Sequence, residues 1–398
     1  MPDFASDVVI IGGCGHVGLP LGIVLADHDT RVVLYDINKS AVDTVNDAVL
    51  PFDEPDAADV LARVIGNGNL RATTDRAVIS QAESVVVVIG TPVDEHLNPE
   101  IFAVPDAVEA FSDELVDGQL LVLRSTIYPG VTERVERLVA GLGRDIDVAF
   151  CPERIAEGKA MVELTALPQL VSARTEQAFQ RAEALFGRIA TDLVRLAPEE
   201  AELAKLFTNT YRYIKFAIAN QFYMIANEYG LDYERIRAGL THEYPRAADL
   251  PGAGLAAGPC LFKDAMQLAA FNNNAFTLGH SAMLVNEGLP LYLVSKADDR
   301  WSLADKTVGI LGMSFKGESD DTRASLSYKL KRILRFRAAD VLCTDPYVTT
   351  DPALVPLEAV LERSDVLFVG APHKVYRSLA PTQPTVDVWN LFDGGVVV

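Results

Sequence analysis

The residues with the clearest chemical potential lie in a loop rich in glycine and alanine near position 260. Residues 252–264 read Gly-Ala-Gly-Leu-Ala-Ala-Gly-Pro-Cys-Leu-Phe-Lys-Asp, so one thiol, Cys260, is followed by Lys263 and Asp264. Small residues let a ligand approach the backbone closely. The run 265–271 predicts a helix, whose N-terminus favours the thiolate form of a preceding cysteine. Cys260 is therefore a candidate nucleophile, and the alternative is a small buried cysteine in a tight turn.

A second candidate pair interrupts an apolar stretch over 198–229, which predicts one unbroken helix of about 45 Å. Lys205 and Asn209 are four residues apart and share one face of it. Burying a lysine costs free energy unless an anion lies nearby. This pair therefore indicates either a site that binds an anion or a salt bridge within the fold. Because apolar residues surround most of the helix, we expect it to be buried, in part against a second copy of the chain.

The first half of the chain carries a dinucleotide-binding pattern. An apolar strand over 7–12 is followed by Gly-Cys-Gly-His-Val-Gly and then by a helical pattern over 19–26. The next strand, 31–35, ends at Asp36, at the distance that the dinucleotide fingerprint requires. The helix N-terminus would hold a pyrophosphate, and Asp36 would accept hydrogen bonds from ribose hydroxyls and favour NAD over NADP. The alternative is an unliganded tight turn. The residues expected to line NAD here are Gly13, Gly15, His16, Val17, Gly18 and Asp36.

Polar residues stand at the ends of the strands that follow. Apolar runs over 84–92, 119–124 and 147–150 predict further buried strands. In an open parallel sheet, ligands meet the carboxyl ends of the strands, which is where Thr91, Thr126 and Glu153 stand. Hydroxyl groups at helix starts are also common as caps, so the two threonines have a structural alternative.

The last hundred residues repeat this strand and helix pattern. Four more strands are predicted, over 306–312, 339–345, 365–372 and 385–390. The first turn, Gly-Met-Ser-Phe-Lys-Gly, lacks the dinucleotide fingerprint and offers Lys316, which suits a phosphorylated ligand. The charged residues that follow could also be a solvated surface.

Composition bounds the class of protein. The chain has 398 residues, 49% of them hydrophobic, which suggests two or three globular domains. A formal charge of −20 argues against binding to nucleic acid or to an anionic membrane. No apolar run is long enough to predict a transmembrane helix. Four widely spaced cysteines fit the reducing cytoplasm and predict no metal site.

These patterns predict an α/β fold. It has two doubly wound Rossmann-like domains, joined by a long central helix and a small helical domain. We expect an NAD-binding domain over 1–196, a helical domain with the dimerisation helix and the cysteine loop over 197–297, and a nucleotide-sugar domain over 298–398.

At this level of detail the sequence resembles the UDP-glucose/GDP-mannose dehydrogenase family, the nucleotide-sugar 6-dehydrogenases. The resemblance covers nearly all of the chain. It is carried by 13–18, Thr91-Pro92, Ser125-Thr126, Cys151-Pro-Glu-Arg154, 201–209, Tyr244-Pro-Arg246, Gly258-Pro-Cys260, Lys263-Asp264, Phe315-Lys316 and 320–323.

The resemblance implies a role for each site residue. The catalytic residues would be the nucleophile Cys260, the oxyanion-binding pair Lys205 and Asn209, and, around the hydrolytic water, Asp264, Glu153 and Thr126. NAD would also meet Thr91, Ser125, Thr126, Lys263 and Arg323. The UDP-sugar would meet Glu153, Arg154, Lys205, Asn209, Arg246, Gly254, Phe315 and Lys316.

The family reaction explains these residue types. Oxidising a primary alcohol to an acid removes four electrons, so two NAD molecules are reduced for each sugar. A cysteine thiolate that traps the intermediate aldehyde forms a thiohemiacetal and then a thioester, which water hydrolyses. The implied product is a uronic acid for polysaccharide precursors, made by a cytoplasmic homodimer joined through the 198–229 helix.

The substrate and the class of protein have alternatives. Cys151-Pro-Glu-Arg154 resembles the branch that acts on UDP-N-acetylhexosamines such as UDP-N-acetylmannosamine, whereas Lys263-Asp264 resembles the UDP-glucose branch. We favour the acetamido sugar, because Arg154 would adjoin the sugar end. A two-electron dehydrogenase of the hydroxyacid kind would have no use for Cys260, and a non-catalytic NAD sensor would not need it either.

Overall fold

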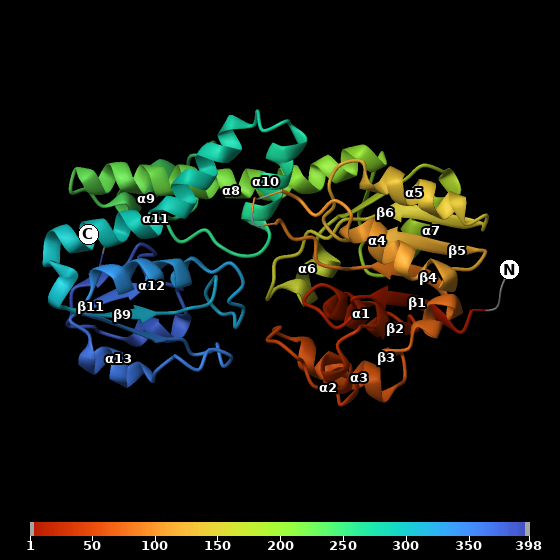
Figure 1. Ribbon diagram of the computed structural model, residues 1–398, viewed down its shortest axis with the longest axis horizontal. Coiled ribbons are helices and arrows are strands. Elements are labelled where there is room, and N and C mark those ends of the chain that lie inside the picture. Colours follow the sequence, from red (N-terminus) through yellow and green to blue (C-terminus); the bar gives the residue numbers. More distant parts are fainter. Residues whose placement is uncertain (1–3, 95, 97, 395–398) are drawn as a thin grey trace. The chain divides into compact units, whose positions relative to one another are not determined.

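The structure is a computed structural model that describes residues 4–94, 96 and 98–394. It divides the chain into two compact units, residues 1–208 and 209–398, which are described separately below (Figure 1). The second unit contains both the cysteine loop and the C-terminal sheet. The predicted division into three domains stays a prediction.

The first unit is built on an eight-stranded sheet in the order β3-β2-β1-β4-β5-β6-β7-β8. The strands are β1 (Ser6–Ile11), β2 (Val32–Tyr35), β3 (Leu70–Thr73), β4 (Ala82–Val87), β5 (Gln119–Leu123), β6 (Ile146–Phe150), β7 (Gln169–Ala173) and β8 (Leu193–Leu196). From β3 to β6 all pairs are parallel, as the sequence predicts, but β7 pairs with β6 in the antiparallel direction.

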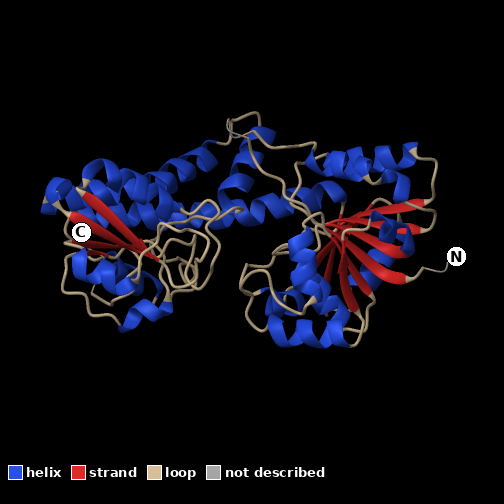
Figure 2. Cartoon of the chain, turned by 60° about the horizontal axis from the view of Figure 1, so that its bottom comes forward, coloured by secondary structure: helices blue, strands red, loops and turns tan. Residues whose placement is uncertain are grey.

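Alternating side chains of these strands pack into two separate cores. Val8 and Ile10 of β1 belong to one core, whereas Val9 and Ile11 belong to the other. A strand that is covered on both faces needs apolar residues throughout, which explains the continuous apolar runs in the sequence. Figure 2 shows helices beside this sheet. The helices are α1 (Gly18–Asp27), α2 (Lys39–Asn46), α3 (Ala57–Gly66), α4 (Ala103–Ala110), α5 (Val131–Gly141), α6 (Ala160–Ala166) and α7 (Glu176–Phe186).

The long predicted helix exists as α8 (Pro198–Glu228). Part of its apolar surface is buried within the single chain, but several large apolar residues are exposed. They are Phe207, Tyr211, Ile218, Phe222 and Ile225, each more than 40% exposed. Other residues of α8, such as Tyr213 and Tyr223, are fully buried, so the helix has one face in the core and another face open.

The second unit combines helices with a smaller parallel sheet in the order β10-β9-β11-β12. Its strands are β9 (Thr307–Leu311), β10 (Asp340–Thr344), β11 (Val366–Val369) and β12 (Thr385–Val386). The last strand is shorter than the predicted 385–390. The helices are α9 (Tyr233–Thr241), α10 (Leu261–Phe271), α11 (Thr277–Trp301), α12 (Leu326–Arg337) and α13 (Leu357–Arg363).

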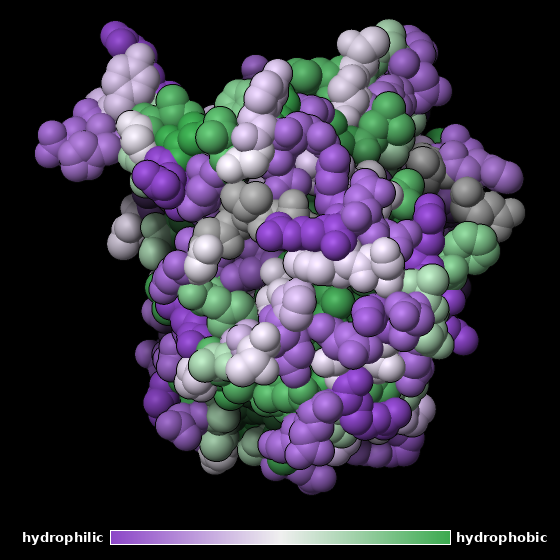
Figure 3. All heavy atoms as spheres, turned by 90° about the vertical axis from the view of Figure 1, so that its left-hand side faces the viewer, coloured by the Kyte–Doolittle hydropathy of each residue, from purple (hydrophilic) through white to green (hydrophobic). Residues whose placement is uncertain are grey.

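Both faces of this second sheet are also covered. Val308 and Ile310 pack with α8, α11 and α12, and Leu311 packs on the opposite side with Val360 of α13. The predicted α/β class with two parallel-dominated sheets and a long helix is therefore confirmed. No helix among the described residues has the length and apolar character that crossing a membrane requires. On the face drawn in Figure 3, apolar residues lie among hydrophilic ones.

Candidate active site

The glycine-rich turn after β1 forms a cradle that larger residues would fill. A Cβ atom on Gly18 would lie 2.5 Å from the Gly12 carbonyl oxygen, and one on Gly13 would lie 2.7 Å from Leu34 Cβ. Gly12 itself has a φ of +75° and starts the turn, a position that the sequence prediction omitted although the Gly12-Gly13 pair was visible. At Gly15 a Cβ would meet only the Gly12 oxygen, at 3.7 Å. The backbone is therefore open to a close ligand at Gly15.

The turn lies where a dinucleotide is expected to bind. It follows β1, whose neighbours β2 and β4 mark the point at which the strand order reverses. No side chain caps the N-terminus of α1 at Val17, so the first amides of α1 can face a phosphate. Asp36, at the end of β2, accepts hydrogen bonds from the amides of Cys14 and Asn38, both at 3.0 Å. These features fit NAD, with Asp36 held at the edge of the glycine turn.

The hydroxyl residues after β4 and β5 tie these two strand ends together. Thr91 Oγ1 donates to the Thr126 carbonyl oxygen at 2.7 Å. Ser125 Oγ donates to the Ile89 carbonyl at 2.9 Å and accepts from the Ile89 amide at 2.8 Å. The structure therefore brings three predicted cofactor residues together, and it gives Thr91 and Ser125 a structural role as well.

Glu153 lies in a buried ion pair that the sequence did not reveal. Its Oε2 accepts a hydrogen bond from Arg124 at the end of β5, and its Oε1 accepts from the amides of Arg154 and Ile155 at 2.7 and 3.0 Å. Arg124 is 1% exposed and also donates to Gln169 Oε1 at 3.1 Å. Arg154 donates to the Pro168 carbonyl, and burial lowers the pKa of its guanidinium. A charged residue that ends an otherwise apolar strand was the only sequence signal for Arg124.

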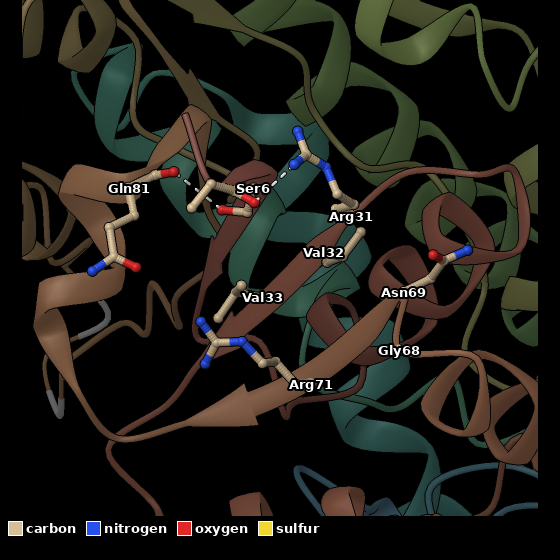
Figure 4. A pocket seen from close by; sticks show the side chains of 9 residues that line it. Ser6, Arg31, Val32, Val33, Gly68, Asn69, Arg71 and Gln81 are labelled. Carbon is tan, nitrogen blue, oxygen red and sulfur yellow. Dashed lines mark hydrogen bonds between the residues drawn. The ribbon is translucent and has the colours of Figure 1, made fainter. Parts of the chain in front are cut away.

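A small cavity in the same unit lies away from this edge. It has a volume of about 120 Å³ and is lined by residues at the amino ends of β1, β2 and β3, among them Ser6, Arg31, Asn69 and Arg71 (Figure 4). Ligands of an open parallel sheet bind at the carboxyl ends of the strands. This cavity is therefore not the predicted nucleotide site.

Cys260 stands directly before α10, as predicted. It is the N-cap residue, it is exposed, and its carbonyl accepts the Asp264 amide hydrogen bond at 2.9 Å. Asp264 lies one turn further and is fully buried. The other three cysteines are buried, and burial raises the pKa of Cys14 and Cys151 to about 12. Cys260 is thus the one cysteine of the described residues that a substrate can reach.

Asp264 links the cysteine helix to α8. Its Oδ2 accepts a hydrogen bond from Asn209 Nδ2 at 2.6 Å, and Lys263 Nζ lies 3.1 Å from its Oδ1. Lys205 precedes Asn209 by about one helical turn on α8, and the two side chains are 8% and 4% exposed as residues. The structure therefore brings Asn209, Asp264 and Lys263 together at the start of α10.

A buried asparagine fixes the glycine loop that leads to Cys260. Asn220 of α8 accepts from the Gly254 amide at 2.9 Å and donates to the Gly254 carbonyl at 3.0 Å. It also donates to Asn286 Oδ1 of α11 at 2.9 Å. A Cβ atom on Gly254 would lie 2.2 Å from the Trp389 ring, so the position requires glycine. Sequence reasoning missed Asn220, because only the folded chain places it against residue 254.

The remaining predicted substrate residues, and the predicted cofactor residue Arg323, lie on other loops of the second unit. Phe315 packs against Gly258, where a Cβ atom would lie 2.7 Å from its ring, and Lys316 Nζ lies 5.6 Å from the centre of that ring. Arg323 makes hydrogen bonds of 2.6 to 3.0 Å with the Asp321 carboxylate. Arg246 stays with Tyr244 of its own loop, at 3.3 Å from the phenol oxygen.

Three domain models of one protein family match successive parts of this chain. Residues 6–190 match the NAD binding domain of the UDP-glucose/GDP-mannose dehydrogenase family, residues 199–288 its central domain, and residues 309–394 its UDP binding domain. The three matches together cover the glycine turn, the Lys205–Asn209 pair with the cysteine helix, and the second parallel sheet.

Individual relatives match over nearly their whole length. A UDP-N-acetyl-D-mannosamine dehydrogenase of Pyrococcus horikoshii is 30% identical over 93% of this chain and 90% of its own. An NDP-N-acetyl-D-galactosaminuronic acid dehydrogenase of Ralstonia solanacearum is 30% identical over 95% of this chain and 93% of its own. The solved structure of a UDP-glucose dehydrogenase from Pyrobaculum islandicum matches with a TM-score of 0.88 and 25% identity, over 97% of this chain and 95% of that one. The chain thus belongs to the UDP-glucose/GDP-mannose dehydrogenase family and is an NAD-dependent nucleotide-sugar dehydrogenase.

Proposed function

We propose that this protein oxidises the C6 primary alcohol of a UDP-sugar to the uronic acid in one site, with Cys260 as a covalent nucleophile. The observation that carries the proposal is an exposed cysteine at the N-cap of α10, one turn before a buried aspartate that is bonded to Asn209. A dehydrogenase that made only the aldehyde or a ketone would not need this nucleophile.

The four-electron oxidation needs two hydride transfers. Bound NAD supplies the hydride acceptor. Loss of the first hydride and of the hydroxyl proton converts the alcohol into an aldehyde. Cys260 Sγ then forms a bond to the aldehyde carbon, and the carbonyl oxygen becomes the hydroxyl group of a thiohemiacetal. Loss of a second hydride and a proton gives a thioester, and water then breaks the carbon–sulfur bond to release the acid and restore the thiol.

Lys205 and Asn209 would stabilise the negative charge that develops on the former carbonyl oxygen. A cation and an amide donor held in a buried position act as an oxyanion hole, and they need no rearrangement during the reaction. Asn209 is already fixed by Asp264, so its amide has one defined orientation.

For the hydrolytic water, Asp264 and Glu153 are the two candidate bases. Both carboxylate oxygens of Glu153 already accept hydrogen bonds, from Arg124 and from two backbone amides. Both carboxylate oxygens of Asp264 are engaged as well, Oδ2 by Asn209 and Oδ1 by Lys263. We prefer Asp264 as the general base because it lies one helical turn after Cys260, with Thr126 as a further ligand of the water, and we assign Glu153 to holding the loop that carries Arg154.

The proposed sugar is a UDP-N-acetylhexosamine such as UDP-N-acetylmannosamine, and UDP-glucose is the alternative. Relatives named for acetamido sugars at 30% identity and the Cys151-Pro-Glu-Arg154 motif support the first. Substrate contacts are proposed from Arg154, Arg246, Gly254, Phe315 and Lys316, and cofactor contacts from the glycine turn, Lys263 and Arg323. The uronic acid would serve polysaccharide precursors, and the reducing cytoplasm would keep the Cys260 thiol reactive.

We also propose a homodimer formed through α8. Tyr211, Ile218, Phe222 and Ile225 are spaced at seven, four and three residues, and each is at least 41% exposed. Such spacing places them on one side of a helix, as in helices that pair with a partner. Large apolar residues gathered on one exposed helix face typically mark a protein interface.

The substrate proposal is tested by incubating the protein and NAD with a panel of UDP- and GDP-sugars. NADH is followed by absorbance, and the products are identified by mass. We expect the fastest NADH formation with UDP-N-acetylmannosamine and a product that is heavier than the substrate by one oxygen minus two hydrogens. Faster turnover of UDP-glucose would support the alternative, and inactivity with every sugar nucleotide would contradict both.

A further inference from the structure

The loop between β9 and α12 carries Phe315 and Lys316 (Figure 1). Two buried polar residues from other strand ends hold this loop. Asp345 follows β10, and His373 follows β11. The side chains of both are 0% exposed, and Ser314 in the loop is 1% exposed. Buried polar groups of this kind must be satisfied by hydrogen bonds, and here the partners lie on the loop itself.

Asp345 fixes the beginning of the loop. Its Oδ2 accepts hydrogen bonds from the amides of Met313 and Ser314 at 2.6 and 3.0 Å. Its Oδ1 accepts from the amides of Tyr347 and Val348 at 2.9 and 3.1 Å. The carboxylate therefore ties the start of the loop to the turn that follows β10.

His373 joins this carboxylate to the far end of the same loop. Its Nδ1 accepts a hydrogen bond from the Glu318 amide at 3.0 Å, so Nδ1 carries no proton. The ring proton is then on Nε2, which lies 3.1 Å from Asp345 Oδ2 and 3.2 Å from Ser314 Oγ. Ser314 Oγ donates its own proton to the Lys316 carbonyl at 2.6 Å. The hydrogen-bond pattern thus selects one neutral tautomer of His373.

The segment between these two anchors has little freedom. Glu318 has a φ of +56°, and its carboxylate accepts hydrogen bonds from the Lys374 amide at 2.7 Å and the Tyr347 hydroxyl at 3.3 Å. A Cβ atom on Gly317 would lie 2.6 Å from the Pro372 carbonyl oxygen. Residues 315–317 therefore form a short arch between residue 314 and the His373–Glu318 bond.

The arch also meets the cysteine loop. The Phe315 ring packs against Gly258, where a Cβ atom would lie 2.7 Å from the ring, and the φ of +104° there also favours glycine. The Gly258 amide donates to the Ala324 carbonyl at 3.4 Å. Gly258 is two residues before Cys260 in the sequence, so the position of the arch bears on the backbone that presents the nucleophile.

We propose that His373 is a positioning residue for the UDP part of the substrate. Its Nδ1 accepts the hydrogen bond of the Glu318 amide and so fixes the end of the arch. This bond holds Lys316 and Phe315 in the arrangement that binds the nucleotide. This inference rests on the proposed function, because it assigns Lys316 to the substrate. His373 itself touches neither substrate nor cofactor. It strengthens binding because the arch is already ordered before the ligand arrives, so less conformational entropy is lost when UDP binds.

The test measures UDP binding by calorimetry with the full chain and three variants. In His373→Asn, the amide oxygen takes the place of Nδ1 and can still accept from Glu318. In His373→Gln, the amide nitrogen takes the place of Nε2 and can still donate to Asp345, but the acceptor for Glu318 is lost. His373→Leu removes both. Val360→Ala is the matched control. Val360 lies on α13 and packs in the core against the same sheet, so its loss lowers stability without touching the loop.

We expect His373→Leu and His373→Gln to bind UDP about tenfold more weakly, the effect of one lost hydrogen bond of about 1.4 kcal/mol. His373→Asn should stay within about threefold of the original chain, and Val360→Ala should bind normally. NAD affinity should be unchanged in all of them, because the glycine turn lies in the other unit.

Equal UDP affinity in His373→Leu and the original chain would overturn the inference. So would equal weakening in His373→Asn and His373→Gln, or in His373→Leu and Val360→Ala. If His373→Leu does not fold, the comparison of the asparagine and glutamine variants still decides the matter. Failure of the original chain to bind UDP would contradict the proposed function itself, and the inference with it.

Discussion

Cys260 is the residue whose removal separates the proposed covalent reaction from its alternatives. Its exposed position at the start of α10 means that Cys260→Ala should leave the fold unchanged. Without the thiol no thioester forms, so we expect uronic acid formation to fall by about a thousandfold or more. Product analysis by mass spectrometry measures this directly.

The control is Cys343→Ala, which changes a buried cysteine of β10 that has no predicted role of its own. The rate of uronic acid formation by this variant should stay within about twofold of the original, since a small change in the core lowers the free energy of unfolding but does not alter the reacting groups. Acid formation at the normal rate by Cys260→Ala would show that the protein uses no cysteine nucleophile.

Asp345 should make the second unit sensitive to acid. Burial alone raises the pKa of this carboxyl, but hydrogen bonds from His373, Tyr347 and Met313 outweigh it and lower the pKa to about 2, from 3.8 in the unfolded chain. Because the folded pKa is the lower one, the stabilisation is complete above pH 4 and is lost as the pH falls toward 2, and it amounts to about 2 kcal/mol.

Urea unfolding of the original chain and of Asp345→Asn at several pH values isolates this contribution. The difference in the free energy of unfolding should be largest at pH 5 and should shrink by pH 2.5. A difference that stays constant over this range would mean that Asp345 does not titrate with a lowered pKa.

At the scale of elements, the turn between β1 and α1 makes the sharpest demand on its residues. In Gly18→Ala the new Cβ would lie 2.5 Å from the Gly12 carbonyl oxygen, so the turn must open and the first amides of α1 must move. We expect the KM for NAD to rise at least about tenfold, the effect of losing one or two hydrogen bonds to phosphate.

Gly141→Ala in α5 is the matched control, because a Cβ atom there meets nothing within 4 Å. Its KM for NAD should not change, and its stability should rise slightly, because alanine favours a helix over glycine. An unchanged KM in Gly18→Ala would place the NAD pyrophosphate elsewhere.

The elements themselves were largely predictable, because their signals are local. Runs such as 8–11 and 308–311 hold no polar side chain, since each strand is covered on both faces. Strands β3, β7 and β8 were not predicted, and the antiparallel direction of β7 could not have been, because its pairing with β6 depends on how the chain returns through α6. The short β12 reflects the turn after Val386, which the sequence does not mark clearly.

The site was predictable to the extent that single residues carry chemistry. Cys260, Lys205, Asn209 and Asp264 could be named from their types and spacing, and the structure then joined Asn209 to Asp264. Arg124, Asn220 and His373 could not be named, because each acts through a partner far away in the sequence. Supporting residues of this kind become visible only when the chain is folded.

At the scale of the whole molecule, the open face of α8 makes association of two chains testable. Ile218→Glu with Phe222→Glu places two charges in the exposed apolar row, where burial against a partner would be costly. Sedimentation velocity should show a dimer for the original chain and a monomer for this double variant.

Phe336→Glu is the matched control, since Phe336 on α12 is 87% exposed and lies outside the α8 row. Its sedimentation should equal that of the original chain. If the double variant stays dimeric while Phe336→Glu dissociates, the interface lies on α12 and the α8 proposal is wrong.

The most direct test of the central claim is the ratio of NADH formed to UDP-sugar consumed, measured together in a single reaction run to completion. The account predicts two NADH for each sugar, with the uronic acid as product, because Cys260 retains the half-oxidised carbon until a second hydride has left it. A ratio of one, with an aldehyde or a ketone released, would contradict it.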